Sequence, residues 1–391
     1  MPILFLIIFI DLLGFGLVIP LLPFFGLHFG ASTDEVTWLL GAYSLAQLIS
    51  SPLLGRMSDR FGRRPVLLLG LGASVLSYIW MGFADQLWML FAARFLAGAG
   101  AGTIGAVFAY VTDVTSADRR ARGMGMIGAA LGLGFTFGPA LGGLLSSGSP
   151  ENVKLLVPCL VAASLSAIAL VLTAALLKES LPPEARRARR VGRIAFARQM
   201  LHRPVLRRLI LIAFITTTAF AALETTFALW AKDTFDWGPR EIGLIFFYVG
   251  LVLSLIQGGA IGPLTRRLGE VRLLIGGVAL LMLGLLGMAF VGRVAELLVA
   301  TGALSAGMAL FSPSSNSLIS REASADERGG ILGVSQSTQS LARVVGPLVS
   351  GPLFTAFGRN APYFAGAAAM VVVVLLAIGL LRDAPAEAGV T

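Results

Sequence analysis

Four ionisable residues stand inside long apolar stretches of this sequence, where charges are otherwise rare: Asp11, Arg94, Glu224 and Arg343. A charge at the centre of a bilayer costs at least ~2.5 kcal/mol, so such side chains are expected to face the interior and mark a pathway. A carboxylate in that position can take up and release a proton, and an arginine can supply a fixed counter-charge. The chemistry that these residues predict is therefore proton binding inside a membrane.

The composition indicates that the apolar stretches cross a membrane. Of 391 residues, 56% are hydrophobic and 13% charged, and the mean hydropathy is +0.85. Soluble domains carry about 25% charged residues. Each crossing needs roughly 20 apolar residues, and stretches this long are helices rather than barrel strands, so we predict an all-α membrane protein. The twelve predicted transmembrane helices are 2–26, 36–57, 65–84, 87–110, 123–147, 154–177, 209–231, 242–263, 271–291, 296–318, 330–356 and 361–381.

Other kinds of chemistry are not expected. Cys159 is the single cysteine and only two histidines are present, so we expect no disulfide, no metal site and no cofactor. Two Gly-x-Gly-x-x-Gly matches, at Gly100 and Gly123, follow no predicted strand, and no P-loop is found. The net charge of +9 arises between the apolar stretches, which favours anionic lipid heads over nucleic acid as the partner.

The basic residues also predict an orientation. Most of the 30 lie in alternate loops, above all in the segment 178–208. By the positive-inside rule, this segment and both termini are predicted to be cytoplasmic. The run 184–190 could form a short amphipathic helix on the inner leaflet or a solvated linker.

An internal repeat predicts two related halves. A shift of 207 to 208 residues aligns Gly55, Arg60 and Gly62 with Gly262, Arg267 and Gly269, and Gly138-Pro139 with Gly346-Pro347. So many matches at nearly one offset indicate duplication of a six-helix unit. The predicted domains are a helical bundle 1–177, a linker 178–208 and a second bundle with a short tail, 209–391.

Regularly spaced glycines predict close helix packing. Gly134, Gly138 and Gly142 fall four residues apart, as do Gly98 and Gly102, so each set presents one face to which another helix can approach at backbone distance. Pro139, in the same stretch as the first set, removes a helix hydrogen bond and allows a bend.

Several of these segments resemble one family of transporters. The segment 55–64 resembles the loop signature between helices 2 and 3 of the major facilitator superfamily, and a weaker copy starts at Gly262. The segment 11–17, followed by two prolines, is similar to helix 1 of twelve-helix drug:proton antiporters, including tetracycline efflux proteins. Arg94 with its two glycines resembles their helix 4 motif, and 134–143 the helix 5 motif of antiporters. The resemblance implies two six-helix bundles that work by alternating access.

We therefore predict a proton-coupled exporter of small amphipathic compounds, not an enzyme, in a bacterial cytoplasmic membrane. Its expected partners are the substrate, protons and membrane lipid, and we expect a monomer. Asp11 and Arg94 are the predicted proton-coupling residues, and Arg343 is a candidate structural partner of Glu224. The candidate substrate-binding residues are Glu224, Phe15, Tyr43, Gln47, Phe220, Phe227 and Gln257. The candidate gating residues are Asp59, Arg60, Arg63, Arg64, Asp113, Gly138 and Pro139.

Two other functions stay open from the sequence. The same fold could serve a metabolite uptake protein or facilitator that couples to no proton. The chain could instead be a membrane partner or receptor without transport, although buried Asp11 and Glu224 would then be costly residues without a purpose. The sequence leaves the substrate open.

Overall fold

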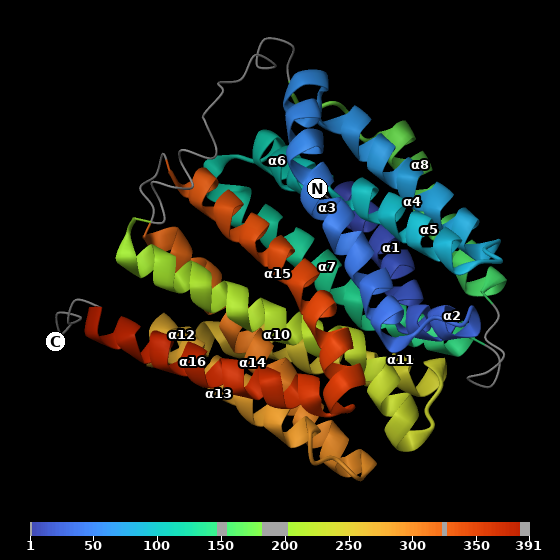
Figure 1. Ribbon diagram of the computed structural model, residues 1–391. Helices are drawn as coiled ribbons and strands as arrows, with labels where there is room; N and C mark the ends of the chain where they lie inside the picture. The colour runs from blue at the N-terminus through green and yellow to red at the C-terminus, as the bar shows by residue number, and fades with distance from the viewer. Residues whose placement is uncertain (1, 147–154, 182–201, 323–326, 384–391) are drawn as a thin grey trace. The chain divides into compact units, whose positions relative to one another are not determined.

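The computed structural model describes residues 2–146, 155–181, 202–322 and 327–383, and every regular element in these ranges is helical (Figure 1). The prediction of an all-α membrane protein is confirmed. Eleven of the described helical segments are long and apolar enough to cross a membrane. A twelfth, α3 (Thr33–Phe61), has 29 residues and extends about 43 Å, but it is less apolar. The run 184–190 lies outside the described residues.

Contacts divide the chain into two compact units. Unit 1 comprises residues 1–189 and 227–250, and unit 2 comprises 190–226 and 251–391. The division passes through two helices, α10 (Pro204–Phe235) and α11 (Pro239–Leu255). The predicted bundles 1–177 and 209–391 were defined by the repeat in the sequence, whereas these units are defined by contacts. The predicted bundles stay a prediction.

Unit 1 holds the first helices of the chain. Its core is built by α1 packing against α7 and α8, by α3 against α5, and by α4 against α5 and α8. Besides α3, its elements are α1 (Pro2–Val18), a 3-10 turn η1 (Ile19–Leu21), α2 (Leu22–His28), α4 (Arg63–Gly82), α5 (Leu87–Ala101), α6 (Ile104–Val114), α7 (Ala117–Leu145) and α8 (Leu156–Leu176).

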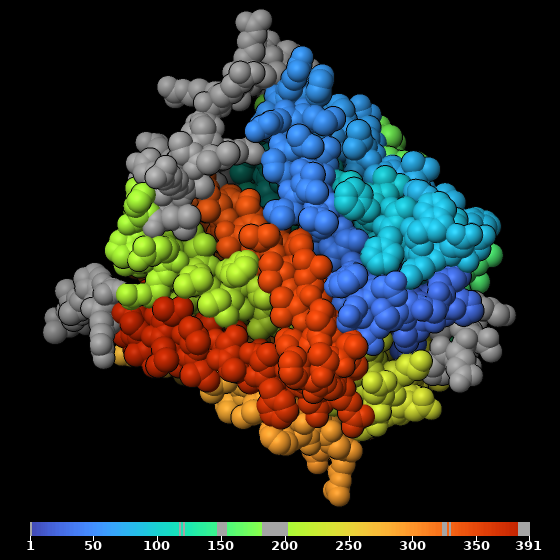
Figure 2. All heavy atoms as spheres, in the orientation of Figure 1, coloured from blue at the N-terminus to red at the C-terminus, as the bar shows by residue number. Residues whose placement is uncertain are grey.

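Unit 2 is organised around α13, which packs against both α14 and α16; in Figure 1, α13 and α16 run side by side. In Figure 2, the side chains of α15 (orange) and α16 (red) meet on the face that is drawn. Val371, Val372 and Leu375 of α16 are exposed, as expected of side chains that face lipid. The elements that follow α11 are a π-helical turn η3 (Ile256–Ala260), α12 (Ile261–Leu268), α13 (Glu270–Met288), α14 (Val294–Arg321), α15 (Arg328–Phe357) and α16 (Ala361–Asp383).

Three of the predicted single helices are interrupted. The stretch 2–26 breaks at η1, because Pro20 and Pro23 each remove a helix hydrogen bond close to this turn. The stretch 87–110 breaks between α5 and α6, around Gly102. The stretch 242–263 contains the π-helical turn η3. Apolar length predicted these crossings but carries no information about such breaks.

The turn between α3 and α4 is tighter than the sequence suggested. Asp59 and Arg60 belong to the last turn of α3, and α4 begins at Arg63, so the connection is Gly62 alone. Gly62 has a φ of +108°, which glycine adopts without strain. Gly269, its counterpart in the repeat, has a φ of +78° and likewise joins α12 to α13. The repeated glycines therefore serve the same turn in both units.

The spaced glycines make the close contacts that the sequence predicted. A Cβ added at Gly138 of α7 would lie 2.7 Å from the Cα of Gly16 in α1, which is closer than real Cβ contacts. A Cβ at Gly134 would lie 2.6 Å from the Cβ of Leu12. These glycines let α1 and α7 pack at backbone distance.

Candidate functional site

Asp11 lies in the middle of α1 and is held by a neighbouring helix. The Oγ of Ser166 in α8 donates a hydrogen bond of 2.7 Å to Asp11 Oδ1. Ser166 is fully buried, whereas Asp11 is partly exposed. The carboxylate thus has one fixed hydrogen-bond partner inside unit 1, and a carboxylate held in this way can bind and release a proton.

Arg94 of α5 is buried among aromatic rings. Its side chain is 2% exposed, and its Nε and Nη1 atoms have no hydrogen-bond partner. The guanidinium carbon lies 4.5 Å from the ring centre of Tyr43 and 5.7 Å from that of Phe15. The two rings are themselves 4.8 Å apart. Cation–π attraction is therefore the main contact that the structure gives this charge.

Two residues that sequence reasoning missed surround these charges. Ser166 is one, through its bond to Asp11. Tyr78 of α4 is the other: it is 2% exposed and close enough to interact electrostatically with both Asp11 and Arg94. A polar side chain inside an apolar stretch was the available signal for both. The structure therefore brings Asp11, Arg94, Phe15 and Tyr43 into one interior region of unit 1.

Gln47, one turn after Tyr43 on α3, has a packing contact in this structure. Its Nε2 donates to the backbone oxygen of Ala101 at 3.3 Å, which ties α3 to the end of α5. Its proposed place in a substrate-binding wall is not tested by this contact.

Unit 2 contains the second pair of membrane charges. Glu224 of α10 and Arg343 of α15 interact electrostatically, but no ion pair within 4 Å joins these two described side chains. A hydroxyl contact that sequence reasoning missed involves Thr225, the residue after Glu224 on α10. The Oγ atoms of Thr225 and Ser350 are 3.2 Å apart, linking α10 to α15.

The other candidate wall residues lie in different surroundings. Phe227, in unit 1, is buried, with its ring centre 6.2 Å from Trp230 and 5.7 Å from Phe246. Phe220 is partly buried on the part of α10 that belongs to unit 2. Gln257 is exposed in the π-helical turn η3.

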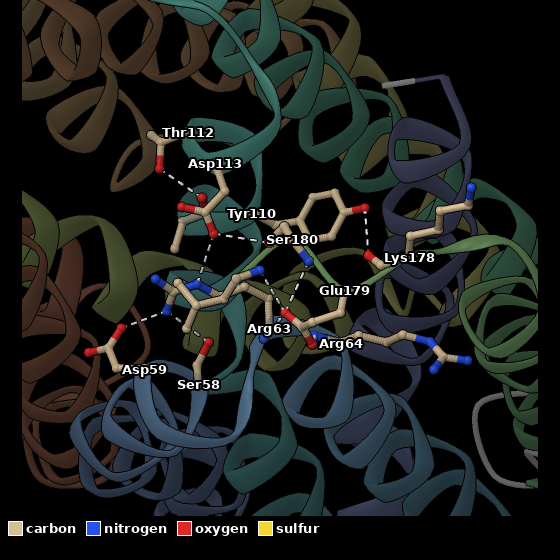
Figure 3. Close-up of polar contacts among 12 residues, drawn as sticks. Ser58, Asp59, Arg63, Arg64, Tyr110, Thr112, Asp113, Lys178, Glu179 and Ser180 are labelled. Carbon is tan, nitrogen blue, oxygen red and sulfur yellow. Dashed lines mark hydrogen bonds and ion pairs between the residues drawn. The ribbon is translucent and has the colours of Figure 1, made fainter. Parts of the chain in front are cut away.

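Arg63 is the centre of a polar cluster at the turn between α3 and α4 (Figure 3). Its Nη1 donates to Asp59 Oδ1 at 2.6 Å and to Ser58 Oγ at 3.1 Å. Its Nε donates to Asp113 Oδ2, near the end of α6, at 3.1 Å. Three of the candidate gating residues thus meet in what we call the Arg63 cluster. The side chains of the other two basic candidate gating residues, Arg60 and Arg64, make different contacts.

Those two residues contact the helices around the turn. The Arg60 guanidinium lies 5.2 Å from the ring centre of Phe61, and Arg64 Nη2 donates to the backbone oxygen of Ala174 in α8 at 2.5 Å. Arg64 therefore links the start of α4 to the end of α8.

Glu179, which follows α8, is a further residue beside the Arg63 cluster that sequence reasoning missed. Its carboxylate accepts backbone N–H bonds from Arg63 at 2.8 Å and Arg64 at 3.1 Å, and others from Ser180 and Leu181 at 3.0 Å (Figure 3). Burial by itself raises the pKa of the Glu179 carboxyl, but these four bonds outweigh it and hold the pKa below its ordinary value of 4.5. Glu179 is therefore an anionic cap on the first turn of α4.

Pro139 and the glycines of α7 also meet α11 within unit 1. A Cβ added at Gly243 of α11 would lie 3.1 Å from the Cα of Gly143, and one at Gly250 would lie 2.6 Å from Thr136 Oγ1. A Cβ at Gly243 would also clash with the backbone oxygen of Pro139. One face of α7 therefore packs on α1, and residues 239–250 pack on α7.

No group of three or more His, Cys, Asp or Glu side chains suited to a metal ion occurs among the described residues. Apolar helices that bury single charges, together with a charged cluster at a tight interhelical turn, define an α-helical membrane transporter. The comparisons with known proteins agree with this class.

The model of the Major Facilitator Superfamily matches residues 4–292 and 209–391. The class C tetracycline resistance protein of Escherichia coli is 33% identical over 362 residues, covering 89% of this chain and 87% of that protein. Multidrug resistance protein 2 of Bacillus subtilis is 31% identical over 357 residues, covering 89% and 86%. The solved structure of the human organic anion transporter MFSD10 is 27% identical, with a TM-score of 0.74 and coverage of 96% and 98%. The chain belongs to the Major Facilitator Superfamily and is an integral membrane protein.

Proposed function

We propose that this protein exports small amphipathic compounds across the bacterial cytoplasmic membrane in exchange for protons, by alternating access, without chemically changing them. The observation that carries the proposal is Asp11, a carboxylate in the middle of α1 that is held by Ser166. Similarity to tetracycline and multidrug resistance proteins over most of the chain supports drug efflux. Protons, lipid and substrate are the proposed partners of a monomer.

The roles that we assign follow from the site. Asp11 carries the proton, and Arg94 supplies a fixed positive charge in the same region of unit 1. The Arg63 cluster and the glycine contacts of α7 serve as gating elements, because ion pairs at helix ends can be exchanged between two discrete packings. Glu224 and the aromatic residues remain the candidate substrate wall.

A single proton site is energetically sufficient for the proposed export. One proton entering down one pH unit and 100 mV supplies roughly 3.7 kcal/mol. That free energy supports a gradient on the order of 500-fold for a neutral compound. The proposal therefore needs one titratable group in unit 1, and Asp11 provides it.

The test compares Asp11→Asn with Asp85→Asn, which removes an exposed carboxylate between α4 and α5. In energised membrane vesicles, we expect Asp11→Asn to abolish uphill transport of a fluorescent multidrug substrate while the control retains it. We also expect exchange of that substrate down its own gradient to survive in the Asp11 variant. Uphill transport by Asp11→Asn at the unaltered rate would remove Asp11 from the coupling role.

The same vesicles separate the two alternatives. Equal flux with and without a proton gradient would indicate a facilitator, and no flux of any compound in a broad library would indicate a membrane protein that does not transport. Anionic compounds belong in that library, because the similar human protein MFSD10 is an organic anion transporter.

A further inference from the structure

Arg94 is a buried cation without a matching anion. Its side chain is 2% exposed, and neither its Nε nor its Nη1 atom has a hydrogen-bond partner. Both atoms are strong donors, and a buried guanidinium that lacks acceptors loses its hydration without replacement. The contacts that are present, to the rings of Phe15 and Tyr43, offset only part of the cost of burying this ion.

The nearby carboxylate of Asp11 has a hydrogen-bond partner on another helix. Asp11 Oδ1 accepts its 2.7 Å hydrogen bond from Ser166 of α8. Among the ion pairs formed by described residues, none within 4 Å joins Arg94 to an acidic side chain. The remaining ionisable neighbours that interact electrostatically with Arg94 are Tyr43 and Tyr78, which are neutral at pH 7. Arg94 therefore has no acidic counter-ion within 4 Å among the described residues.

The rings beside Arg94 form a partly exposed aromatic group. Phe15 packs against Tyr43 at 4.8 Å and against Phe135 at 5.6 Å, and both Phe15 and Tyr43 are partly exposed although Arg94 behind them is buried. Phe135 is exposed. An aromatic ligand can stack on such rings, and each of the two partnerless donors of Arg94, Nε and Nη1, can bond an anionic oxygen.

We propose that Arg94, framed by Phe15 and Tyr43, binds the anionic group of aromatic amphiphiles, so that aryl carboxylates and related organic anions are among the exported compounds. This inference rests on the proposed export function and names a substrate class for it. Asp11 keeps the proton in this scheme. Arg94 then has two roles: it is a fixed positive charge, and it contacts the anionic group of the ligand.

The experiment measures binding rather than transport. The purified protein in detergent is titrated at pH 7.5 with 2-naphthoate, with its uncharged methyl ester, and with 2-naphthylmethylammonium. The variants are Arg94→Gln, which removes the charge, Arg94→Lys, which keeps it, and Arg207→Gln as a control that removes an exposed charge at the start of α10. Thermal unfolding of each variant reports whether it is folded.

We expect the wild-type protein and Arg207→Gln to bind naphthoate at least tenfold more tightly than the ester or the cation. Arg94→Gln should lose this preference while its affinity for the ester stays the same, and Arg94→Lys should keep part of the preference. Equal wild-type affinity for naphthoate and its ester, a preference for the cation, or no naphthoate binding would each overturn the proposal. Where Arg94→Gln does not fold, Arg94→Lys carries the assignment: a preference equal to that of the wild type would overturn the proposal.

The two proposals fail differently. Because binding in detergent needs no proton gradient, naphthoate preference without uphill efflux in vesicles would refute the exporter and keep the anion site. Uphill efflux of neutral compounds without naphthoate preference would refute the anion site and keep the exporter.

Discussion

Glu179 fastens the segment after α8 to the beginning of α4. Its carboxylate accepts the N–H groups of Arg63 and Arg64, which a helix start leaves without intrahelical partners. Glu179→Gln keeps one acceptor oxygen and loses the charge, so we expect a loss of about 1–2 kcal/mol of stability, seen as a lower melting temperature in detergent. Glu322→Gln, at an exposed carboxylate after α14, should leave it unchanged.

The contribution of Glu179 should also depend on pH. Because the folded-state pKa of Glu179 is lowered from 4.5, its stabilisation is fully present above that value and disappears as the pH falls through the lowered pKa. The difference in melting temperature between wild type and Glu179→Gln should therefore be constant from about pH 5.5 to 7 and shrink below about pH 4.5. A difference that grew on acidification would contradict the assigned cap.

The sequence predicted the buried charges but not their partners. Asp11 and Arg94 stood out because charges are rare in apolar stretches. Ser166 did not, because a serine or threonine in a membrane helix usually bonds the carbonyl four residues earlier, as Ser164 and Thr173 do in the same helix. Which hydroxyl turns to another helix depends on the rotation of α8 about its axis, and that rotation is a property of packing.

Among the helices, α7 depends most directly on missing side chains. A Cβ at Gly138 would lie 2.7 Å from Gly16 and 2.9 Å from the backbone oxygen of Leu13, so Gly138→Ala has to push α1 and α7 apart. We expect a loss of about 1–3 kcal/mol together with slower efflux. The matched control is Gly125→Ala on the same helix, where a Cβ meets nothing within 4 Å. That change should be neutral or stabilise by up to ~1 kcal/mol, because alanine favours a helix.

Equal melting temperatures for the two alanine variants would show that α7 has room to move at Gly138.

The existence of such helices followed from apolar length, and the close approach followed from glycine spacing. The partner of each glycine face did not, because spacing identifies a smooth face without saying which helix covers it. Gly243 and Gly250 of α11, which meet α7, carry no spacing that distinguishes them in the sequence.

At the scale of the whole molecule, the duplication and the orientation stay predictions with a direct test. Cys159 is buried, so the natural chain offers little background to a membrane-impermeant maleimide. Exposed positions at both kinds of helix end are available for single cysteines. Asp85 and Arg359 lie in connections that the positive-inside rule places outside, and Arg267 and Glu322 lie in connections that it places in the cytoplasm.

We expect Asp85→Cys and Arg359→Cys to be labelled in intact spheroplasts, and Arg267→Cys and Glu322→Cys to be labelled only in inverted vesicles. The two outside positions belong to different halves of the predicted repeat. If the two six-helix units have the same orientation, both positions lie on the outer side of the membrane. Inverted labelling of all four would reverse the predicted topology. Opposite labelling of Asp85→Cys and Arg359→Cys would mean an odd number of crossings between them, and a parallel duplication with twelve crossings would then be impossible.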